Sequence, residues 1–484
     1  MERKLSDMLA DAGVVERRGP EEQNIASVGF DSRTVTPGQL FVALRGTQSD
    51  GHAFIPGAVA SGAVAIVCEQ WPEEIAPQVT YLRVEDSHAA LGRIASGFYD
   101  HPSRKLRLVG VTGTNGKTTT ATLLYDLYRE LGYKAGLIST VTYAVDGRET
   151  PSTHTTPDPV RLNALLAEMA DCGCGFCFME VSSHSIVQRR IEGLAFAGGV
   201  FTNITHDHLD YHKTFAEYIR AKKAFFDALP QEAFALVNGD DRNGGAMVQN
   251  TRAAVRTFAL KSFADFRGRV VETVPEGMLL NLDGSEVWVR FLGGFNAYNL
   301  LGVYACARLL GSDRDEVLRV LSRLESVRGR FETVYSKTGV TAVIDYAHTP
   351  DALANVLKTV AGICPRGKKI YTVVGCGGNR DRTKRPVMAR IAVENSHLAI
   401  LTSDNPRFEK PEDILEEMKA GLPPDARTLV IADRREAIKT AAMLAAPGDV
   451  VLVAGKGHET YQDVAGTKHH FDDREEVRRA FGLE

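Results

Sequence analysis

The 484-residue sequence lacks several features that define whole classes of protein. Its seven cysteines are an odd number spread thinly over the chain, which indicates reduced thiols rather than a disulfide framework. The first residues contain no apolar segment of signal-peptide length, and no later run approaches the ~20 apolar residues of a membrane span. The formal net charge of -4 gives no basic field for nucleic acid. We therefore expect a cytoplasmic protein with no membrane span and no nucleic-acid partner.

Three of the cysteines do cluster, and a metal site is one interpretation of them. Cys172, Cys174 and Cys177 are interleaved with glycines, but no second group of Cys or His lies at zinc-ligand spacing. We favour the other interpretation, in which they are small buried residues at the start of a strand.

The composition and length suit a multidomain globular protein. Apolar residues make up 44% of the chain and charged residues 24%, and the length indicates about three domains of roughly 150 residues. We place these domains at residues 1–103, 104–331 and 332–484.

Strands and helices alternate in the second and third blocks, which is typical of mostly parallel sheets covered by helices. The predicted fold class is therefore α/β, with a small N-terminal α/β domain, a central mononucleotide-binding sheet and a doubly wound, Rossmann-like C-terminal domain. The expected strands cover residues 39–44, 63–68, 80–84, 106–111, 135–139, 176–182, 200–204, 234–238, 342–345, 370–374, 398–402, 428–431 and 450–454.

A glycine-rich segment between an apolar run and a helical stretch predicts a phosphate site. Gly113-Thr114-Asn115-Gly116-Lys117-Thr118 follows residues 106–111 and opens a helix expected over 119–131. Backbone N–H groups and the helix dipole face one point there, Lys117 adds a charge, and Thr118 offers a hydroxyl to magnesium. The expected ligand is a nucleoside triphosphate.

This loop is shorter than the general Walker pattern, because only Thr114 and Asn115 separate its first glycine from Gly116-Lys117. An ordinary Asn-Gly turn is the alternative. The apolar strand before the loop and the amphipathic helix after it favour the phosphate site.

Carboxylates and imidazoles gather at two further strand ends. Glu180 ends an apolar run and is a candidate magnesium ligand, with a helix-capping or surface carboxylate as the alternative. Residues 202–212 contain three histidines and two aspartates. Zinc competes for this group, but magnesium bound to nucleotide phosphates takes few protein ligands, and one imidazole could supplement Glu180 and Thr118.

Six motifs, in this order along the chain, resemble those of the Mur ligases of peptidoglycan synthesis, and they cover all three blocks. They are Gly113–Thr118, Thr155-Thr156-Pro157-Asp158, Met179-Glu180-Val181-Ser182-Ser183-His184, Asp207-His208-Leu209-Asp210-Tyr211-His212, Asp345-Tyr346-Ala347-His348-Thr349-Pro350-Asp351-Ala352-Leu353 and Gly455-Lys456-Gly457-His458-Glu459. Within the family, the chain looks most like the ligase that adds the third residue of the stem peptide.

The resemblance implies an ATP- and Mg²⁺-dependent, ADP-forming amide ligase that joins UDP-MurNAc-L-Ala-D-Glu to meso-diaminopimelate. The N-terminal domain would hold the UDP-sugar, the central domain ATP and the C-terminal domain the incoming amino acid. The reaction would pass through an acyl phosphate, and the incoming amine must lose its proton, for which His208 and His348 are both candidates. We expect a monomer.

The resemblance also implies roles for individual residues. ATP would contact Gly113, Thr114, Asn115, Gly116, Lys117, Thr118, Thr119, Asn299, Arg330 and Asp345. The UDP-MurNAc-dipeptide would contact Ser32, Thr155, Thr156, Ser182, Gln188 and Arg190. Diaminopimelate would contact Arg385, Asp404, Asn405, Pro406, Arg407, Gly455 and Glu459. Lys117, Glu180, His208 and Lys222 would be catalytic, and the metal ligands would be Thr118, Glu180, His208 and Lys222 as a carbamate.

Lys222 has a plain alternative, because a lysine on a helix, here expected over residues 214–229, is usually a solvated charge. The neighbouring Lys223 projects about 100° away around such a helix. The family resemblance favours Lys222 as the modified residue.

Residues 404–407, Asp-Asn-Pro-Arg, suggest the choice of amino acid. They form a turn after an expected strand, and an arginine fork there can bind a carboxylate bidentately. That chemistry suits meso-diaminopimelate, whose distal carboxylate is missing from L-lysine, and Glu459 is available for the distal ammonium. The chain differs from the family pattern at two positions. His154 stands where some members have asparagine, and Arg328 stands where proline is commoner before Gly329-Arg330. These differences concern only local substrate and hinge contacts.

Other functions stay open as alternatives. They are the same ligase acting on L-lysine, a folylpolyglutamate-synthase-like ligase, a P-loop switch or transport ATPase, and a dinucleotide-binding module built on Gly375-Cys376-Gly377-Gly378. The last is the weakest because its glycine fingerprint is incomplete.

Overall fold

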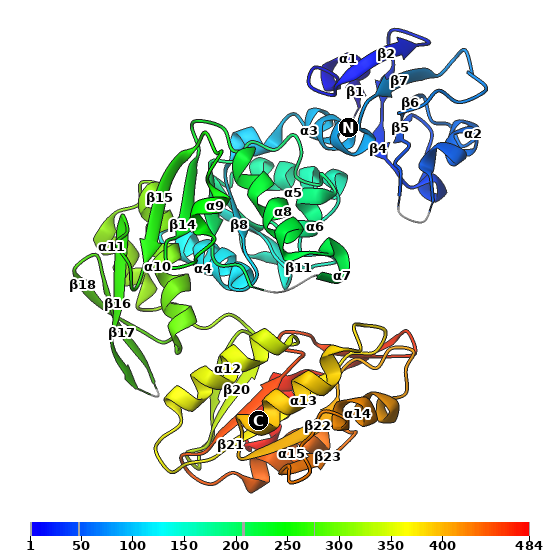
Figure 1. The fold of residues 1–484 in the computed structure, drawn as a ribbon. Helices are drawn as coiled ribbons and strands as arrows, with labels where there is room; N and C mark the ends of the chain where they lie inside the picture. The colour runs from blue at the N-terminus through cyan, green and yellow to red at the C-terminus, as the bar shows by residue number, and fades with distance from the viewer. Residues whose placement is uncertain (1, 47–48, 206–208, 275, 484) are drawn as a thin grey trace.

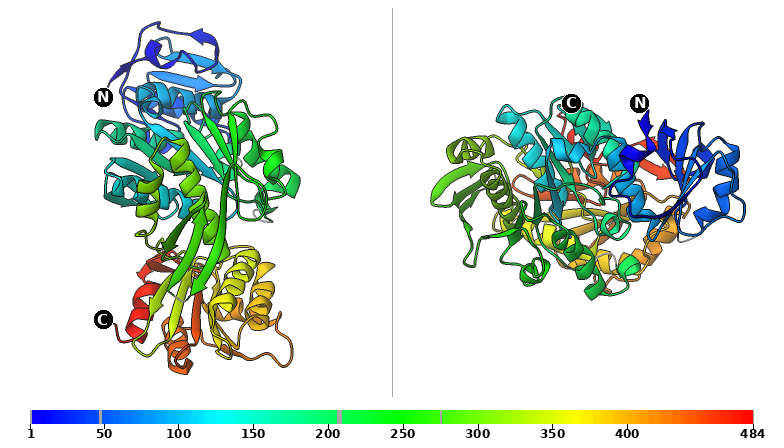
Figure 2. Two further views of the ribbon diagram at one scale, coloured as in Figure 1. Left: turned by 90° about the vertical axis from the view of Figure 1, so that its left-hand side faces the viewer. Right: turned by 90° about the horizontal axis from the view of Figure 1, so that it is seen from above.

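The computed structural model describes residues 2–46, 49–205, 209–274 and 276–483. Three units follow one another along the chain, each built around its own sheet (Figure 1). The N-terminal and C-terminal units lie at opposite ends of the central unit (Figure 2). No helix in the described part of the chain is long and apolar enough to cross a membrane.

The N-terminal unit has the sheet order β2-β7-β6-β5-β4, in which the last four strands are parallel and β2 pairs antiparallel with β7. These strands are β2 (Val14–Arg18), β4 (Ser27–Gly29), β5 (Gln39–Val42), β6 (Ala65–Cys68) and β7 (Thr80–Val84). A short pair, β1 (Arg3–Lys4) and β3 (Asn24–Ile25), and helices α1 (Leu5–Met8), α2 (Ile55–Ala60) and α3 (Ser87–Phe98) complete the unit.

The central unit has the order β11-β10-β9-β12-β8-β13-β14-β15-β16-β17-β18. The strands from β9 to β16 in this order are parallel, and an antiparallel hairpin extends each end of the sheet. The strands are β8 (Arg107–Thr112), β9 (Ala135–Ile138), β10 (Thr142–Val145), β11 (Arg148–Pro151), β12 (Phe176–Glu180), β13 (Gly198–Phe201), β14 (Phe234–Asn238), β15 (Ala254–Ala259), β16 (Phe266–Val274), β17 (Gly277–Leu282) and β18 (Ser285–Val289). The helices are α4 (Lys117–Glu130), α5 (Pro159–Asp171), α6 (Ser183–Val187), α7 (Leu209–His212), α8 (Phe215–Asp227), α9 (Gly244–Met247), α10 (Gly294–Leu309) and α11 (Arg314–Leu321).

Both faces of the middle of this sheet, from β9 to β14 in the order above, are buried, which explains why these strands are mostly apolar. Val109 and Val111 of β8 join the core formed with α4 and α10, whereas Leu108 joins the core on the other face with α5 and α8. The phosphate-loop segment therefore leaves a strand that is fixed from both sides.

The C-terminal unit has the order β19-β20-β24-β21-β22-β23, parallel except for β19. Its strands are β19 (Glu332–Tyr335), β20 (Thr341–Asp345), β21 (Ile370–Cys376), β22 (Leu398–Ser403), β23 (Thr428–Val430) and β24 (Val450–Ala454), with a separate hairpin of β25 (Tyr461–Val464) and β26 (Thr467–His470). The helices are α12 (Pro350–Ile363), α13 (Lys384–Glu394), α14 (Pro411–Lys419), α15 (Arg434–Leu444) and α16 (Asp473–Ala480).

The predicted α/β class is confirmed, but the antiparallel hairpins at the ends of the central sheet were not predicted. β16 is mostly exposed, so its sequence has no continuous apolar run. Both hairpins turn at Asp-Gly pairs, Asp146-Gly147 and Asp283-Gly284, and all four residues have positive φ. Asp-Gly is the residue pair that such tight hairpin turns favour, so the sequence did carry a local signal for them.

Candidate active site

The loop between β8 and α4 has the geometry of a phosphate cradle. Gly113 and Gly116 have φ of 153° and 85°. A Cβ on Gly113 would lie 2.0 Å from Thr202 Oγ1, and one on Gly116 would lie 2.4 Å from Asn299 Oδ1. Only glycine fits at these two positions, and Asn299 is thereby placed directly against the loop.

The loop is fastened to the segment after β13. The N–H of Thr114 donates to the carbonyl of Asn203 at 2.8 Å, and the N–H of Asn115 donates to Asn203 Oδ1 at 3.0 Å. Asn203 Nδ2 returns a bond to the Asn115 carbonyl at 3.0 Å. These bonds fix the conformation of the loop. No role for Asn203 was predicted from the sequence.

Two lysines converge on the carbonyl oxygen of Gly113. Lys117 Nζ lies 2.9 Å from it, and Lys222 Nζ, from α8, lies 2.8 Å from it. Lys222 is only 1% exposed, whereas the neighbouring Lys223 pairs with Asp227 at 2.7 Å. The helix therefore turns Lys222, and not Lys223, toward the phosphate loop.

Glu180 ends β12 beside this loop and is fully buried. Its Oε1 accepts the N–H of Thr140 at 2.6 Å, but its Oε2 is buried without a hydrogen-bond partner among the residues that the structure describes. A buried carboxylate oxygen of this kind needs a cation or a donor, and a hard cation such as magnesium prefers oxygen ligands. Thr118 and Lys222 line the same cavity, so these side chains fit a magnesium ion. His208, the remaining predicted ligand, lies outside the described residues.

The cavity has a volume of about 1120 Å³ and is shared by the central and C-terminal units. From the predicted ATP and dipeptide sets, it is lined by Thr114, Asn115, Gly116, Lys117, Thr118, Thr119, Thr155, Thr156, Ser182, Arg190, Asn299, Arg330 and Asp345. His348 also lines it. The structure thus brings most of the two predicted sets to one place.

Gln188 and Ser32, both predicted to bind the dipeptide, are not among the described residues that line the cavity. Gln188 accepts from Arg190 Nε at 2.9 Å, and Arg190 Nη1 donates to the Thr156 carbonyl at 2.7 Å. Gln188 therefore orients a residue that does line the cavity. Ser32 opens a 3₁₀ turn, Ser32–Thr34, in the N-terminal unit.

The segment that joins the central and C-terminal units passes beside the cavity. Arg330 Nη2 donates to Thr118 Oγ1 at 3.2 Å, and the guanidinium lies 4.7 Å from the ring centre of Tyr346. Asp345 accepts the N–H groups of Phe331 at 2.7 Å and Ala347 at 2.8 Å. Burial raises the pKa of Asp345 to about 6, although Arg330 and these two N–H groups oppose the rise. One arginine thus connects the phosphate loop to the start of the C-terminal unit.

Most of the residues predicted to bind the amino acid follow the ends of β22 and β24. They are Asp404, Asn405, Pro406 and Arg407 after β22, and Gly455 and Glu459 after β24, whereas Arg385 lies in the first turn of α13. Among the described residues that line the cavity, none belongs to this set. The structure therefore assembles a second cluster next to the first without merging the two.

The two arginines of that cluster differ. Arg385 is fully buried and pairs with Glu409 at 2.9 Å and Glu417 at 2.7 Å, so its charge is already neutralised within the unit. Arg407 is partly exposed, has φ of 51°, and donates through Nη1 to the Gly378 carbonyl at 2.9 Å. Arg407 is thus the better placed of the two to meet a ligand.

A phosphate loop, a buried acidic residue and a second doubly wound unit across a shared cavity are the features of a phosphate-loop enzyme whose site lies between two α/β units. Family models match as Mur ligase family, catalytic domain at residues 24–99, Mur ligase middle domain at 111–307, and Mur ligase, glutamate ligase domain at 329–457. This chain belongs to the Mur ligase family.

Individual proteins agree with the family models. The chain is 56% identical over 482 residues to a UDP-N-acetylmuramoyl-L-alanyl-D-glutamate--2,6-diaminopimelate ligase of Bacteroides fragilis, with 99% of each chain covered. A solved structure of a ligase of the same name is 34% identical, covers 95% of each chain and has a TM-score of 0.69. MurF ligase from Thermotoga maritima, solved with ADP, is 22% identical, has a TM-score of 0.61 and covers 94% of this chain and 96% of its own; it shows the shared fold.

Proposed function

We propose that this chain is an ATP-dependent, ADP-forming ligase that joins meso-diaminopimelate to the D-glutamate carboxylate of UDP-MurNAc-L-Ala-D-Glu. The observation that carries the proposal is the shared cavity, which is lined by Lys117, Lys222 and Glu180 together with residues expected to hold the dipeptide. Support comes also from full-length relatives that bear this name. The activity would belong to peptidoglycan precursor synthesis in the cytoplasm.

The chemistry needs a leaving group on the carboxylate. The γ-phosphoryl group of ATP moves to a carboxylate oxygen, ADP leaves, and the amine then attacks the acyl carbon and expels phosphate. The amine loses one proton in that step. Transfer to a carboxylate brings negative charges together, and Lys117, Lys222 as the ammonium and the loop N–H groups lie where they offset them.

A magnesium ion, when bound, would neutralise phosphate charge, and Thr118 and Glu180 would hold it. The buried Oε2 of Glu180, for which no described residue supplies a hydrogen bond, supports this assignment. If Lys222 carries a carbamate, its charge changes from positive to negative and it becomes a further metal ligand. His348 is the described candidate for removing the proton from the amine, because it lines the cavity.

We assign the three steps of recognition to the three units, with boundaries after residues 103 and 331. The N-terminal unit takes the UDP-sugar, the central unit takes ATP, and the C-terminal unit takes the amino acid. The cluster at the ends of β22 and β24 supports the last assignment, because ligands of open α/β sheets bind beyond the carboxyl ends of the strands.

The test is release of ADP by the purified chain with UDP-MurNAc-L-Ala-D-Glu and a panel of amino acids. We expect turnover with meso-diaminopimelate and little with L-lysine. Equal or better turnover with L-lysine would overturn the substrate, and ATP hydrolysis that needs no acceptor amine would overturn the ligase itself.

A further inference from the structure

A buried cation lies beneath the predicted amino-acid cluster. The side chain of Lys456, in the loop after β24, is completely buried. Its Nζ lies 3.0 Å from Asn405 Oδ1 and 3.1 Å from Glu459 Oε2, and it also donates to the Tyr461 carbonyl. An ammonium group has three donors, and they are taken by three oxygens, one from the segment after β22 and two from the segment after β24.

This cation fixes the orientation of the Asn405 amide. Because Lys456 can only donate, it must face the amide oxygen, and the N–H of Asp463 donates to the same oxygen at 3.0 Å. The NH₂ group is then directed at Glu459 Oε2, at 2.7 Å. Asn405 and Glu459 are consequently held in one arrangement, with Glu459 Oε2 accepting from both neighbours.

The charge around Glu459 depends on the same lysine. Burial and Asp404 raise the pKa of Glu459, whereas Lys456 and Asn405 lower it. Two further described residues, Arg434 and Tyr346, also interact electrostatically with Glu459. The guanidinium of Arg434 is fully buried and already paired with Asp473 at 2.7 Å. Lys456 is therefore the cation that bonds directly to Glu459.

We propose that Lys456 is a positioning residue for the amino-acid substrate, because it holds the Asn405 amide and the Glu459 carboxylate ready for an ammonium group of the incoming diamino acid. This inference rests on the proposed function. Lys456 is buried under both side chains and acts through them without touching the substrate. A purely structural lysine predicts something different: removing one partner of a buried ion pair would lower the stability of the unit without acting on one substrate more than on the others.

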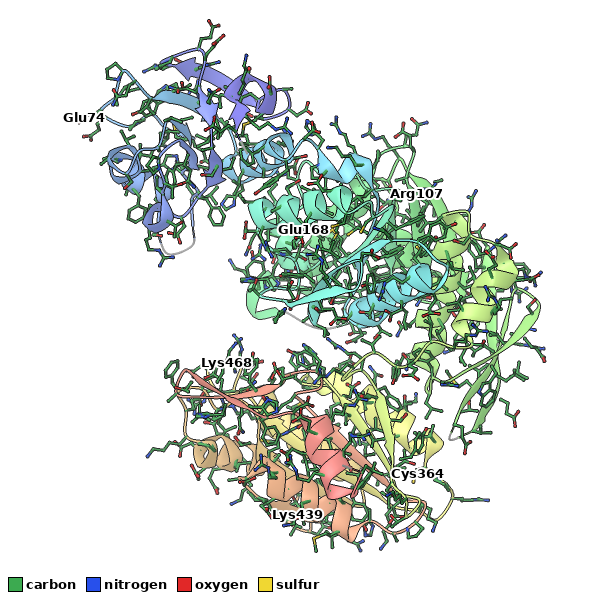
Figure 3. All side chains as sticks on the ribbon, turned by 180° about the vertical axis from the view of Figure 1, so that it is seen from behind. Glu74, Arg107, Glu168, Cys364, Lys439 and Lys468 are labelled. Carbon is green, nitrogen blue, oxygen red and sulfur yellow. The ribbon has the colours of Figure 1, made fainter. Side chains whose placement is uncertain are left out.

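The test is Lys456→Met in the full chain, with KM measured separately for ATP, UDP-MurNAc-L-Ala-D-Glu and meso-diaminopimelate. Loss of one charge-assisted hydrogen bond should raise KM for diaminopimelate by about 10- to 100-fold. The other two KM values should stay within about twofold on the same scale. Lys439→Met is the matched control, because Lys439 is 57% exposed on α15. It lies at the opposite end of the C-terminal unit from Lys468 (Figure 3), which is on β26, the partner strand of β25 and hence of Tyr461.

A second measurement is the pH profile of kcat/KM for diaminopimelate. Without Lys456 the pKa of Glu459 rises further, so the acidic limb of the profile should move to higher pH in Lys456→Met and stay in place in Lys439→Met. A structural role would lower activity without moving this limb.

The outcomes distinguish failure of the positioning role from failure of the proposed function. Unchanged kinetics, or equal increases in all three KM values, would overturn the positioning role. If Lys456→Met does not fold, Lys456→Gln keeps an amide donor for Asn405 without the charge; failure of both variants to fold would make Lys456 a structural residue and end the proposal. A wild type that uses no diamino acid would instead overturn the proposed function.

Discussion

At the scale of single residues, the Gly113 carbonyl is the centre of the proposed nucleotide site, because two ammonium groups from different helices donate to it. Lys117 arrives from the first turn of α4, and Lys222 arrives from the middle of α8. Burying Lys222 costs free energy that its bond to Gly113 and its position 4.8 Å from the Tyr218 ring centre partly offset. Such a lysine is well placed for chemistry at the phosphates.

We predict that Lys222→Ala loses at least ~10²-fold in ADP release, as expected for removing one electrostatic group from such a site. If the active form is a carbamate, a small added carboxylate should restore part of the activity, because it replaces the lost anion. Lys223→Ala is the control, since Lys223 pairs with Asp227 on the same helix. An active Lys222→Ala enzyme would contradict the assignment.

Arg407 is the residue expected to separate the two candidate amino acids. A distal carboxylate can pair with its guanidinium, and L-lysine leaves that charge without a partner of opposite sign, so we predict discrimination of at least ~10²-fold in kcat/KM. Arg407→Ala should lower activity with meso-diaminopimelate much more than the residual activity with L-lysine. Kinetics with both amino acids measure this, and an unchanged ratio would rule Arg407 out as the selector.

At the scale of elements, the sequence predicted best where strands are buried on both faces. The bounds expected for β7, β14 and β24 match the structure residue for residue, because an apolar run bounded by turns leaves little freedom. β16 and the two strands that pair beyond it were not predicted, because β16 is mostly exposed and its sequence has no continuous apolar run. Strand ends elsewhere shifted by one to three residues, as at β13.

The site was predictable to the extent that its chemistry is local. The phosphate loop is one contiguous segment between a strand and a helix, so its residues could be named from the sequence alone. Lys222 required the family resemblance, because burial of a helical lysine depends on what packs against it. Lys456 was seen only as part of a motif, and its contacts with Asn405 come from a residue 51 positions away.

Asp345 links β20 to the connecting segment and makes the stability of this element pH-dependent. Its folded pKa of about 6 lies above the ordinary 3.8, so the folded state binds more protons between these values. Stability from this group is therefore present below about pH 4 and is lost as pH rises through about 6, by up to about 3 kcal/mol.

We predict that the wild type loses up to about 3 kcal/mol of unfolding free energy between pH 4 and pH 7 because Asp345 must ionise while buried. Asp345→Asn has no such group, so its stability relative to the wild type should rise by the same amount. Urea unfolding at each pH measures it. Asp425→Asn, at an exposed position of the same unit, controls for loss of a charge. A difference that does not change with pH would mean that Asp345 keeps an ordinary pKa in the folded chain.

At the scale of the whole molecule, the N-terminal and central units are joined by close packing of α3 on the loop at residues 189–193. A Cβ on Gly92 would lie 2.6 Å from the Glu192 carbonyl oxygen. Arg93 pairs with Glu192 at 2.7 Å and Arg189 with Asp86 at 3.2 Å across the same contact. Because Gln188 and Arg190 flank Arg189, this joint sets where the N-terminal unit lies relative to the cavity.

Gly92→Ala should therefore displace the N-terminal unit, since the new methyl group meets backbone that cannot give way. We expect KM for UDP-MurNAc-L-Ala-D-Glu to rise several-fold, about the effect of 1 kcal/mol of lost binding, with KM for ATP unchanged. Gly57→Ala is the matched control, because Gly57 lies on a helix of the same unit with open space at its Cβ. Equal kinetics for the two variants would show that the joint does not position the substrate.

The separation of the phosphate cavity from the amino-acid cluster has a consequence for energy coupling. In the described geometry, the groups expected to activate the carboxylate share one compartment, and the groups expected to hold the amine lie outside its lining. An acyl phosphate formed before the amine arrives would be open to attack by water, and each such event would consume ATP without product. The yield of amide per ATP thus depends on how quickly the C-terminal unit delivers its amino acid, so a variant can bind both substrates normally and still waste nucleotide.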